Sequence, residues 1–271
     1  MSVRCFTGDR ALPAWPDHDR GLAYGDGLFE TMRAHRGDVH WWDAHWRRLQ
    51  RGADALRLPL PDGDRVRDEA RALLAGADGV LKLIVTRGSG GRGYAVVDGI
   101  EPNWALSAHP LPPPTPADGL YVRWCDTRLA SQPALAGLKH CNRLEQVLAR
   151  NEWSSPEVHE GLVRSVEGDV VSATAANLFV LRDGQWITPP VDRCGVAGVC
   201  REWVLQALHA TQARLAVTEV EAADAVFLCN AVRGILPVAR LGAREWGAHP
   251  QVAQLRRQLA AEHPAFATEV S

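Results

Sequence analysis

The chain has 271 residues, of which 46% are hydrophobic and 23% charged, and its formal net charge is −2 at pH 7. This composition indicates a globular protein of one or two domains, and the lack of a basic stripe or a long apolar run argues against nucleic-acid partners and membrane-spanning helices. Six scattered cysteines without a C-x-x-C pair, no metal-binding spacing of histidines and no apolar signal core predict a cytoplasmic protein with reduced thiols and no metal site.

The first half of the chain predicts alternating strands and helices. Residues 28–42 predict a strand, a turn at 36–38 and a second strand. A helix follows, with Asp43 as its expected N-cap and Pro59 marking its end. Further along, the pattern predicts a second helix over 66–75 and a buried strand over 80–86.

A proline-rich segment divides the chain. Residues 109–119 hold five prolines in eleven positions, which is typical of a linker. We therefore predict a small domain over residues 1–110, a linker over 111–118 and a larger domain over 119–271.

The second half predicts more strands than helices. Residues 120–128 predict a strand, and a helix with one apolar face follows Lys139. Two hairpins are expected at the acidic-Gly pairs 167–168 and 183–184, because such pairs suit two-residue turns. The other expected elements are a glycine turn entering a helix within 194–210, a strand over 224–230 and a loop over 231–238.

Lysine is rare in this chain. Only Lys82 and Lys139 stand among the 30 basic residues, and the others are arginines. An arginine keeps its proton, whereas a lysine amine can lose it and react with a carbonyl group such as the aldehyde of pyridoxal phosphate. Lys82 lies in an apolar run and is expected to face outward from a strand. Lys139 is the candidate nucleophile, with an ordinary solvated lysine as the alternative.

Residues 88–93, with the sequence GSGGRG, match a dinucleotide-binding pattern in their letters. That fingerprint must open a helix after a strand, whereas strand-like residues and a proline follow here. We therefore expect a glycine-rich hairpin loop, in which the guanidinium of Arg92 suits a carboxylate. A second glycine turn, at 195–198, precedes a predicted helix, and free N–H groups at a helix N-terminus suit a phosphate.

The chain resembles the fold-type IV pyridoxal-phosphate enzymes in seven motifs, which are, in order, RGLAYGDGLFET, HWRRL, GSGGRGY, LAGLKHCNRLEQVL, ATAANLF, GVAGVCR and FLCNAVRGILPV. This is the class of the branched-chain and D-amino acid aminotransferases. Within it the chain is similar to the lyases that act on 4-amino-4-deoxychorismate, over about residues 15–240. Arg143 favours the lyases, because the aminotransferases usually carry a tyrosine-containing sequence there.

The resemblance implies an α/β fold of two domains, a small N-terminal α/β domain and a larger domain with a β-barrel-like core. It implies a homodimer, and pyridoxal 5'-phosphate as the cofactor in the cleft between the domains. Lys139 would attach the cofactor through a Schiff base and act in catalysis, and Thr31 would face the active site. The other implied cofactor contacts are Arg48 and the N–H groups of Val199 and Cys200 for the phosphate, Asn230 and Ala231 close to it, and Arg143 and Ser172. The implied substrate contacts are Arg92, Arg128 and Asn142.

Ser172 departs from the family pattern. The family usually carries a glutamate there, which meets the pyridine nitrogen of the cofactor. Val170, Ser172 and Thr174 share a strand face because side chains alternate, and the family pattern turns that face toward the cofactor ring. A hydroxyl cannot hold a proton on the nitrogen as a carboxylate does. We hypothesise that Ser172 is compatible with elimination and disfavours transamination.

The implied reaction converts 4-amino-4-deoxychorismate to 4-aminobenzoate and pyruvate, a step towards folate, with Lys139 as general acid and base. Two alternatives stay open. One is an aminotransferase of the same fold that acts on D- or branched-chain amino acids. The other is a degenerate member that binds ligand without turnover, which the departure at Ser172 keeps open.

Overall fold

The computed structural model describes residues 3–269, which divide into two compact units. The first unit runs to Leu111 and also takes in Leu138–Asn142. The second consists of Pro112–Gly137 and the residues from Arg143 on. The change of unit at Pro112 lies in the proline-rich segment, and the short segment that carries Lys139 belongs to the first unit. No helix among the described residues is long and apolar enough to cross a membrane.

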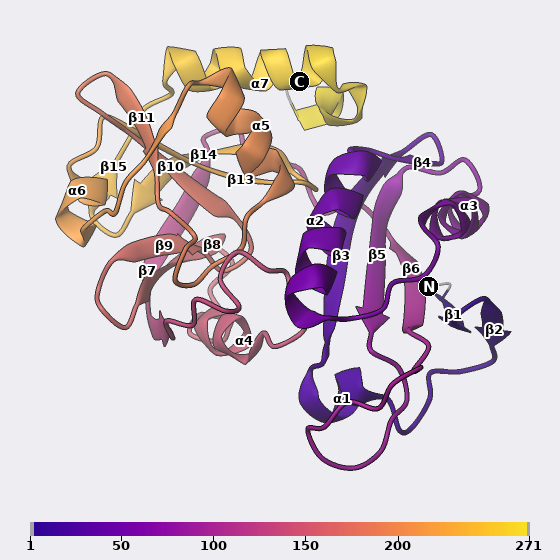
Figure 1. The fold of residues 1–271 in the computed structure, drawn as a ribbon. Coiled ribbons are helices and arrows are strands. Elements are labelled where there is room, and N and C mark those ends of the chain that lie inside the picture. Colours follow the sequence, from indigo (N-terminus) through magenta and orange to yellow (C-terminus); the bar gives the residue numbers. More distant parts are fainter. Residues whose placement is uncertain (1–2, 270–271) are drawn as a thin grey trace. The chain divides into compact units, whose positions relative to one another are not determined.

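The first unit is built on a six-stranded antiparallel sheet in the order β2-β1-β6-β5-β3-β4. Its strands are β1 (Val3–Thr7), β2 (Arg10–Leu12), β3 (Gly27–His35), β4 (Asp38–Val39), β5 (Gly79–Thr86) and β6 (Asn103–His109). Its helices are α1 (Arg20–Tyr24), α2 (Trp42–Leu56) and α3 (Gly63–Leu74). Figure 1 shows α2 running along β3, and the apolar sides of α2 and α3 share one core with the sheet.

Side-chain alternation divides the two faces of β3. Leu28 and Met32 are almost fully buried in the core with α2 and α3, whereas Phe29 and Thr31 point to the other face and are half-buried. The predicted strand at this place is confirmed. The predicted N-cap of α2 is wrong, because the helix begins at Trp42 after Trp41, and Asp43 lies in its first turn, where an acidic side chain favours the helix dipole.

The second unit is built on a curled nine-stranded sheet. The strand path is β12-β11-β10-β13-β14-β7-β8-β9, with β15 beside β14. The strands are β7 (Leu120–Leu129), β8 (Glu160–Ser165), β9 (Val170–Ala173), β10 (Asn177–Arg182), β11 (Gln185–Thr188), β12 (Thr211–Gln212), β13 (Ala225–Asn230), β14 (Gly234–Leu241) and β15 (Arg244–Glu245). Because β9 at the end of the path also lies against β10, the sheet curls around an apolar interior. The predicted barrel-like core is confirmed.

Four helices and one 3-10 turn accompany this sheet: α4 (Leu144–Arg150), α5 (Val199–Ala207), α6 (Val217–Glu221), α7 (Pro250–Glu262) and the turn Pro264–Glu269. Both predicted hairpins are present, as β8–β9 and β10–β11. The predicted two-residue turn is confirmed at Asp183–Gly184 and wrong at the first hairpin, where the Ser165 N–H donates to the Asp169 carbonyl and Glu167 has no positive φ. The predicted loop over 231–238 is wrong, since β14 occupies Gly234–Leu241 and pairs with β13 and β7. Pro237 is tolerated because pairing with β7 begins only at Val238, so its missing N–H breaks no bond of that ladder.

Candidate active site

Lys139 lies on a short segment that is hydrogen-bonded to β3. The Phe29 N–H donates to the Lys139 carbonyl at 3.0 Å, and the Cys141 N–H donates to the Gly27 carbonyl at 2.9 Å. The two stretches form an antiparallel bridge between Leu28 and His140. Backbone pairing of this kind fixes the direction of a side chain. The Lys139 amine is therefore held against the strand by residues more than one hundred positions earlier in the chain.

Both lysines of the chain lie over the same aromatic ring. The Lys139 Nζ is 4.2 Å and the Lys82 Nζ is 5.5 Å from the centroid of the Phe29 ring. An ammonium group over a ring face is attracted by its negative quadrupole. Thr31 lies two residues along the strand from Phe29 and directly opposite Lys82 in the β3–β5 register. The structure thus places Thr31 and both lysines around one face of the first unit.

A buried ionic cluster occupies the other face of β3. The carboxylate of Glu30 accepts hydrogen bonds from Arg48 Nε at 2.8 Å and from Arg48 Nη2, and it lies 2.7 Å from His45 Nδ1. Burial by itself would raise the pKa of Glu30, but the charge and hydrogen bonds of Arg48, with the bond from His45, outweigh it and lower the pKa to about 2. Glu30 is therefore a buried carboxylate at neutral pH, paired with Arg48.

His45 stays neutral in this cluster. Burial lowers its pKa, the charges of Arg48 and Lys139 lower it further, and Glu30 opposes them. A neutral ring that donates from Nδ1 to Glu30 leaves Nε2 without a proton. That Nε2 is buried and has no hydrogen-bond partner among residues 3–269. Glu30 and His45 were missed from the sequence, although a glutamate between Leu28 and Met32 on a core-facing side of a strand was a signal of a buried ionic contact.

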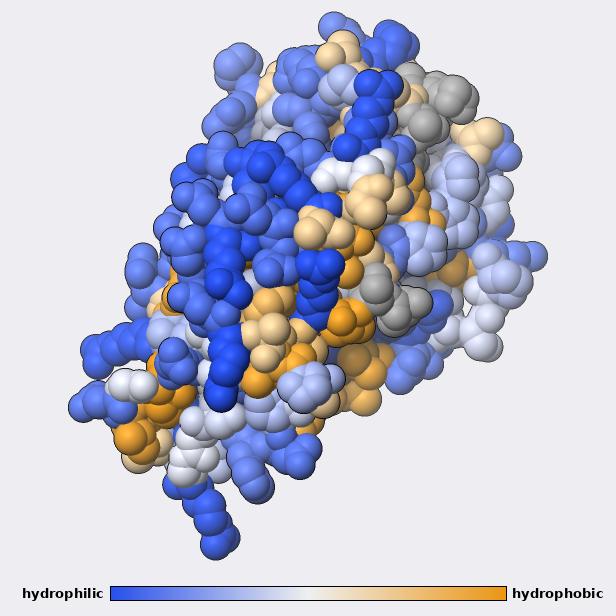
Figure 2. Space-filling model, turned by 90° about the vertical axis from the view of Figure 1, so that its right-hand side faces the viewer, coloured by the Kyte–Doolittle hydropathy of each residue, from blue (hydrophilic) through white to orange (hydrophobic). Residues whose placement is uncertain are grey.

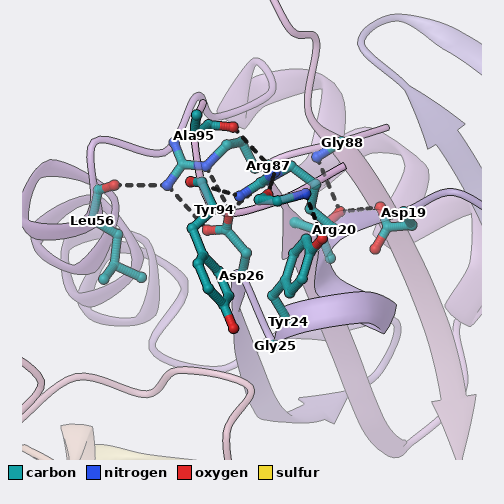
Figure 3. A network of polar contacts seen from close by, with 12 residues as sticks. Asp19, Arg20, Tyr24, Gly25, Asp26, Leu56, Arg87, Gly88, Tyr94 and Ala95 are labelled. Carbon is teal, nitrogen blue, oxygen red and sulfur yellow. Dashed lines mark hydrogen bonds and ion pairs between the residues drawn. The ribbon is translucent and has the colours of Figure 1, made fainter. Parts of the chain in front are cut away.

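Arg92 lies on the loop between β5 and β6. The two strands pair as an antiparallel hairpin closed by Thr86 and Asn103, so the predicted glycine-rich hairpin loop is confirmed. Gly88 and Gly93 have positive φ angles of 104° and 89°, which residues with a Cβ rarely adopt. The Arg92 side chain is exposed. The loop is fastened by a polar network around Arg20, which Figure 3 shows from close by.

Asn142, at the end of the segment that carries Lys139, is hydrogen-bonded to the turn that follows α1. Its Nδ2 donates to the Gly25 carbonyl at 3.2 Å. Gly25 ends α1 with a φ of 66°, and a Cβ there would overlap the Asn142 side chain. This contact fixes where the 138–142 segment ends. A role of Asn142 in binding substrate stays a prediction.

In the second unit, the N-terminus of α5 is a candidate anion site. Gly198 is its N-cap, and no side chain caps the helix within the described part of the chain. A Cβ on Gly198 would overlap the side-chain oxygen of Asn177, whose Nδ2 donates to the Val196 carbonyl at 2.9 Å. The first-turn residues Val199 and Cys200 are buried. Backbone N–H groups at such a helix start attract anions.

The end of β13 meets this helix start. The thiol of Cys200 is hydrogen-bonded to that of Cys229, which directly precedes Asn230, and burial raises the pKa of Cys200 well above its usual range. Asn230 Oδ1 accepts from the N–H groups of Val232 and Arg233 at 3.0 and 2.8 Å. Its side chain thus shapes the turn into β14. The structure brings together Val199, Cys200, Asn230 and the buried Ala231, four of the residues predicted to surround the phosphate.

Ser172 is buried on β9. It is 8% exposed, and its Oγ donates to the Ala173 carbonyl at 2.9 Å. The paired strand β8 begins with Glu160, whose carboxylate accepts from Gly161 N at 2.8 Å and from the hydroxyl of Thr174. Burial raises the pKa of Glu160, against the hydrogen bonds that lower it. Glu160 was missed from the sequence, where only its place at the start of a buried strand could have marked it.

Arg143 and Arg128 lie in different places of the second unit. Arg143 precedes α4 and lines an open pocket of about 450 Å³ together with Glu160, His159 and Thr174. Arg128 is exposed near the end of β7, and its Nη1 donates to the Ser165 carbonyl at 3.3 Å. The structure therefore does not bring Arg128 into the pocket that Arg143 lines.

Comparison with known proteins adds to this geometry. A family model described as amino-transferase class IV matches residues 27–241. The aminodeoxychorismate lyase of Vibrio harveyi is 36% identical over 256 residues, covering 90% of this chain and 93% of that protein. The D-alanine aminotransferase of Bacillus licheniformis is 25% identical over 248 residues, covering 84% of this chain and 83% of that protein.

Solved structures give the same picture. The crystal structure of 4-amino-4-deoxychorismate lyase from Pseudomonas aeruginosa superposes with a TM-score of 0.89 at 41% identity, and the match covers 96% of this chain and 99% of that chain. The branched-chain amino acid aminotransferase from Escherichia coli superposes with a TM-score of 0.82 at 20% identity, covering 100% and 96% of the two chains. The second likeness concerns the fold alone.

Proposed function

Because this chain belongs to the class IV aminotransferase family, we propose that it is a pyridoxal-phosphate-dependent lyase that converts 4-amino-4-deoxychorismate to 4-aminobenzoate and pyruvate. The observation that carries the proposal is its likeness to two lyases of that name over at least nine-tenths of the chain, at a higher identity than to the two aminotransferases compared. The predicted membership of the fold-type IV class is confirmed.

The first unit offers groups that suit the cofactor. Lys139 supplies an amine on a segment that is hydrogen-bonded to β3, over the Phe29 ring. Arg48 supplies a buried guanidinium, and the buried Nε2 of His45 lies beside it without a partner in the described part of the chain. Lys139 and Arg48 both lower the pKa of His45, so two cations that suit an anionic aldehyde cofactor act on one region of the first unit. We propose Lys139 as its point of attachment and Arg48 as a phosphate contact.

The second unit offers a phosphate cradle of backbone groups. The N–H groups of Val199 and Cys200 begin α5 after Gly198, whose missing Cβ lets the Asn177 side chain pack closely against the start of the helix. Asn230 and Ala231 lie beside that helix start through the contact between Cys200 and Cys229. We propose these four residues as phosphate neighbours. Arg143 and Ser172 are proposed as further cofactor contacts from the same unit.

The chemistry assigned to this chain's residues is proton transfer. When bound, pyridoxal phosphate supplies an aldehyde that links to amines and a ring that withdraws electrons from the bond to be broken. The amine of Lys139 takes the proton from the substrate ring carbon that bears nitrogen and returns a proton to the departing enolpyruvyl group. Thr31, next to Phe29 on the same strand face, is proposed to face the reacting atoms. Loss of pyruvate makes the product ring aromatic, which draws the reaction forward.

The substrate carries two carboxylates, and arginine recognises carboxylates with paired hydrogen bonds. Arg92 and Arg128 are proposed as their partners, with Asn142 as an additional polar contact. Arg92 is exposed on its loop, as a residue that meets an incoming ligand must be. Arg128 makes one long hydrogen bond, at 3.3 Å, and is otherwise exposed.

Ser172 separates the lyase from an aminotransferase. A transaminase stores negative charge on the cofactor ring, for which a carboxylate at the pyridine nitrogen helps. An elimination discharges its electrons into the leaving pyruvate, so a hydroxyl at that position is tolerated. We keep the hypothesis that Ser172 disfavours transamination, with an aminotransferase as the second candidate function.

The deciding experiment mixes the purified protein and pyridoxal phosphate with enzymatically prepared 4-amino-4-deoxychorismate and follows the fluorescence of 4-aminobenzoate. Pyruvate is measured in parallel with lactate dehydrogenase and is expected in equal amount. D-Alanine and leucine, each with 2-oxoglutarate, are the comparison substrates. Production of glutamate from either amino acid without any 4-aminobenzoate would refute the lyase hypothesis in favour of the aminotransferase. No product from any substrate would indicate a member that binds ligand without turnover.

A homodimer in the cytoplasm is the remaining part of the proposal. One face of the molecule is mostly hydrophilic, with hydrophobic side chains gathered in patches (Figure 2). On α4, Leu144, Val147 and Leu148 are 76, 50 and 60% exposed. Apolar side chains spaced three and four residues apart share one side of a helix, and such exposed stripes often mark protein interfaces. A second copy of this chain is the partner that the family resemblance implies.

A further inference from the structure

We propose that Arg20 and Tyr24 of α1 are positioning residues for Arg92, because together they fasten the loop that carries it. The inference rests on the proposed function in one respect, namely that Arg92 meets a carboxylate of the substrate. It concerns side chains that lie outside the predicted site. All the groups involved belong to the first unit.

The loop that carries Arg92 makes few stabilising contacts within itself. Residues 90–102 form no helix or strand, and every side chain from Gly91 to Gly99 is exposed. The exposed residues 91–99 therefore gain no hydrophobic stabilisation to offset the entropy of ordering them. The position of Arg92 must therefore come from contacts made by neighbouring elements.

Arg20 provides most of these contacts. Its side chain is 4% exposed, and its guanidinium donates to three successive carbonyls of the loop: Gly93 at 3.0 Å, Tyr94 at 3.3 Å and Ala95 at 3.4 Å (Figure 3). Its Nε donates to Asp26 at 3.0 Å, which anchors the guanidinium itself. A planar fork of five N–H groups can serve four acceptors at once, whereas a lysine ammonium has three donors at one point.

Tyr24 contributes a hydrogen bond to the residue next to Arg92. The N–H of Gly93 donates to the Tyr24 hydroxyl at 3.0 Å. The Tyr24 ring lies 5.5 Å from that of Tyr94 and 5.0 Å from the Arg20 guanidinium carbon. Gly93 is thus held at both its N–H and its carbonyl by α1. Since Gly93 directly follows Arg92, these bonds fix the backbone from which the Arg92 side chain departs.

Arg87 is the matched control within the same network. It also donates to Asp26, at 2.8 and 3.0 Å, and it is as buried as Arg20. Its remaining donors go to the carbonyls of Leu56 and Arg57 at the end of α2. Burial by itself would raise the pKa of Asp26, but the bonds from Arg87 and Arg20 outweigh it and lower that pKa. The two arginines therefore share one carboxylate, and Arg20 holds the loop while Arg87 holds α2.

Trypsin cleavage of the folded full-length protein tests the fastening without any activity assay. Trypsin cuts after arginine, so the Arg92–Gly93 bond in the exposed loop becomes more accessible to the protease when the hydrogen bonds from α1 are lost. Arg20→Lys and Tyr24→Phe are each expected to speed the appearance of the fragment ending at Arg92 about tenfold. Arg87→Lys is expected to lower the melting temperature without speeding this cut. Equal cleavage rates in the wild type, Arg20→Lys and Arg87→Lys would overturn the proposal.

Steady-state kinetics test whether the fastening positions Arg92. Arg20→Lys is expected to raise KM for 4-amino-4-deoxychorismate about tenfold while kcat changes less than about twofold, and Arg87→Lys to leave KM unchanged. In an Arg92→Ala background, Arg20→Lys should raise KM no further, since residues that act through one another are not additive. An unchanged KM in Arg20→Lys, or full additivity with Arg92→Ala, would overturn the positioning role. A wild type that makes no 4-aminobenzoate refutes the proposed function instead, and the cleavage rates then decide alone whether α1 holds the loop.

Discussion

Lys139 and Lys82 contact the same ring from different elements, and this makes them a matched pair. Lys82 belongs to β5 and is paired with Thr31, whereas Lys139 sits on a segment held by backbone bonds to β3. Both amines keep an aromatic face beneath them. Only the amine at position 139 lies on a motif that the family resemblance assigns to the cofactor. Replacing each lysine by arginine separates the loss of an amine from the loss of a cation.

We expect Lys139→Arg to lose turnover and the visible absorbance of bound pyridoxal phosphate, because arginine cannot form the covalent link. Lys82→Arg should retain both, since a guanidinium keeps the cation over Phe29. Absorbance spectra of the purified proteins and the 4-aminobenzoate assay measure the two effects. A spectrum unchanged in Lys139→Arg would contradict the assignment.

Removing the guanidinium of Arg92 should affect substrate use and spare the cofactor. A lost charge-assisted hydrogen bond costs about 1.5–3 kcal/mol, so Arg92→Ala is expected to lower kcat/KM about tenfold to hundredfold. The dissociation constant of pyridoxal phosphate, from fluorescence titration, should stay the same. Arg128→Ala is the parallel variant for the second carboxylate. If Arg92→Ala instead weakens cofactor binding with normal substrate kinetics, Arg92 is a cofactor residue.

Glu30 ties stability to pH. Its pKa falls from an ordinary 4.5 to about 2 on folding, so its contribution is complete above about pH 4.5 and is lost as the pH falls through about 2. The shift corresponds to about 3 kcal/mol. His45 acts in the same direction, since its pKa is lowered on folding and stability falls once the unfolded chain takes up its proton below about 6.5.

We therefore expect Glu30→Gln to be less stable than the wild type at pH 7, with a difference in unfolding free energy that shrinks steadily between about pH 4.5 and pH 2. Urea unfolding at several pH values measures it. Glu157→Gln is the control, since it makes the same chemical change at an exposed glutamate. A difference that stays constant across this range would show that Glu30 is not a buried anion in the native protein.

At the level of elements, the sequence predicted those set by local patterns. The alternation in β3 and β5, the helix α2 and both acidic-Gly hairpins were readable because each depends on residues close in sequence. At the second hairpin Asp183 and Gly184 both take positive φ angles, 51° and 74°, as that turn requires. The strand β14 was predicted as a loop. Proline is disfavoured in a central strand, and whether Pro237 is tolerated there depends on its pairing partner.

The start of α5 offers a prediction at this scale. Gly198→Ala is expected to lower the melting temperature and weaken pyridoxal phosphate binding, since a Cβ would overlap the Asn177 side chain and push the first turn out of place. Thermal unfolding and cofactor titration report the two effects. Gly247→Ala is the matched control, because a Cβ there meets no atom within 4 Å. A wild-type melting temperature and wild-type affinity for pyridoxal phosphate in Gly198→Ala would refute the phosphate site proposed at the start of α5.

For the whole molecule, the candidate site was only partly predictable. The candidate nucleophile Lys139 and the arginine in the glycine-rich loop could be named from composition and local motifs. The position of the Lys139 amine over the Phe29 ring could not be predicted, because it depends on a β-bridge between segments far apart in the chain. The same holds for Glu30 with Arg48 and for Arg20 with the Arg92 loop, where each partner is unremarkable in its own stretch of sequence.

The apolar side of α4 leads to a prediction about assembly. Leu144, Val147 and Leu148 are each exposed by half or more on one helical stripe, and an exposed stripe of this kind is favourable only when it is covered. The wild type is therefore expected to sediment as a homodimer. An isologous interface repeats each contact on both copies, so a single charge placed in it counts twice. Leu148→Asp should shift the protein to monomers at micromolar concentration, as measured by sedimentation velocity.

Val166→Asp is the control for this shift, because it introduces the same charge at a different place. Val166 is 59% exposed at the turn between β8 and β9, away from α4 in the sequence. That variant should remain a dimer, and both variants should keep the wild-type circular dichroism spectrum. A dimer that survives Leu148→Asp would place the interface elsewhere. A wild type that sediments as a monomer at every concentration would refute the homodimer and leave the α4 stripe as a surface for a different partner.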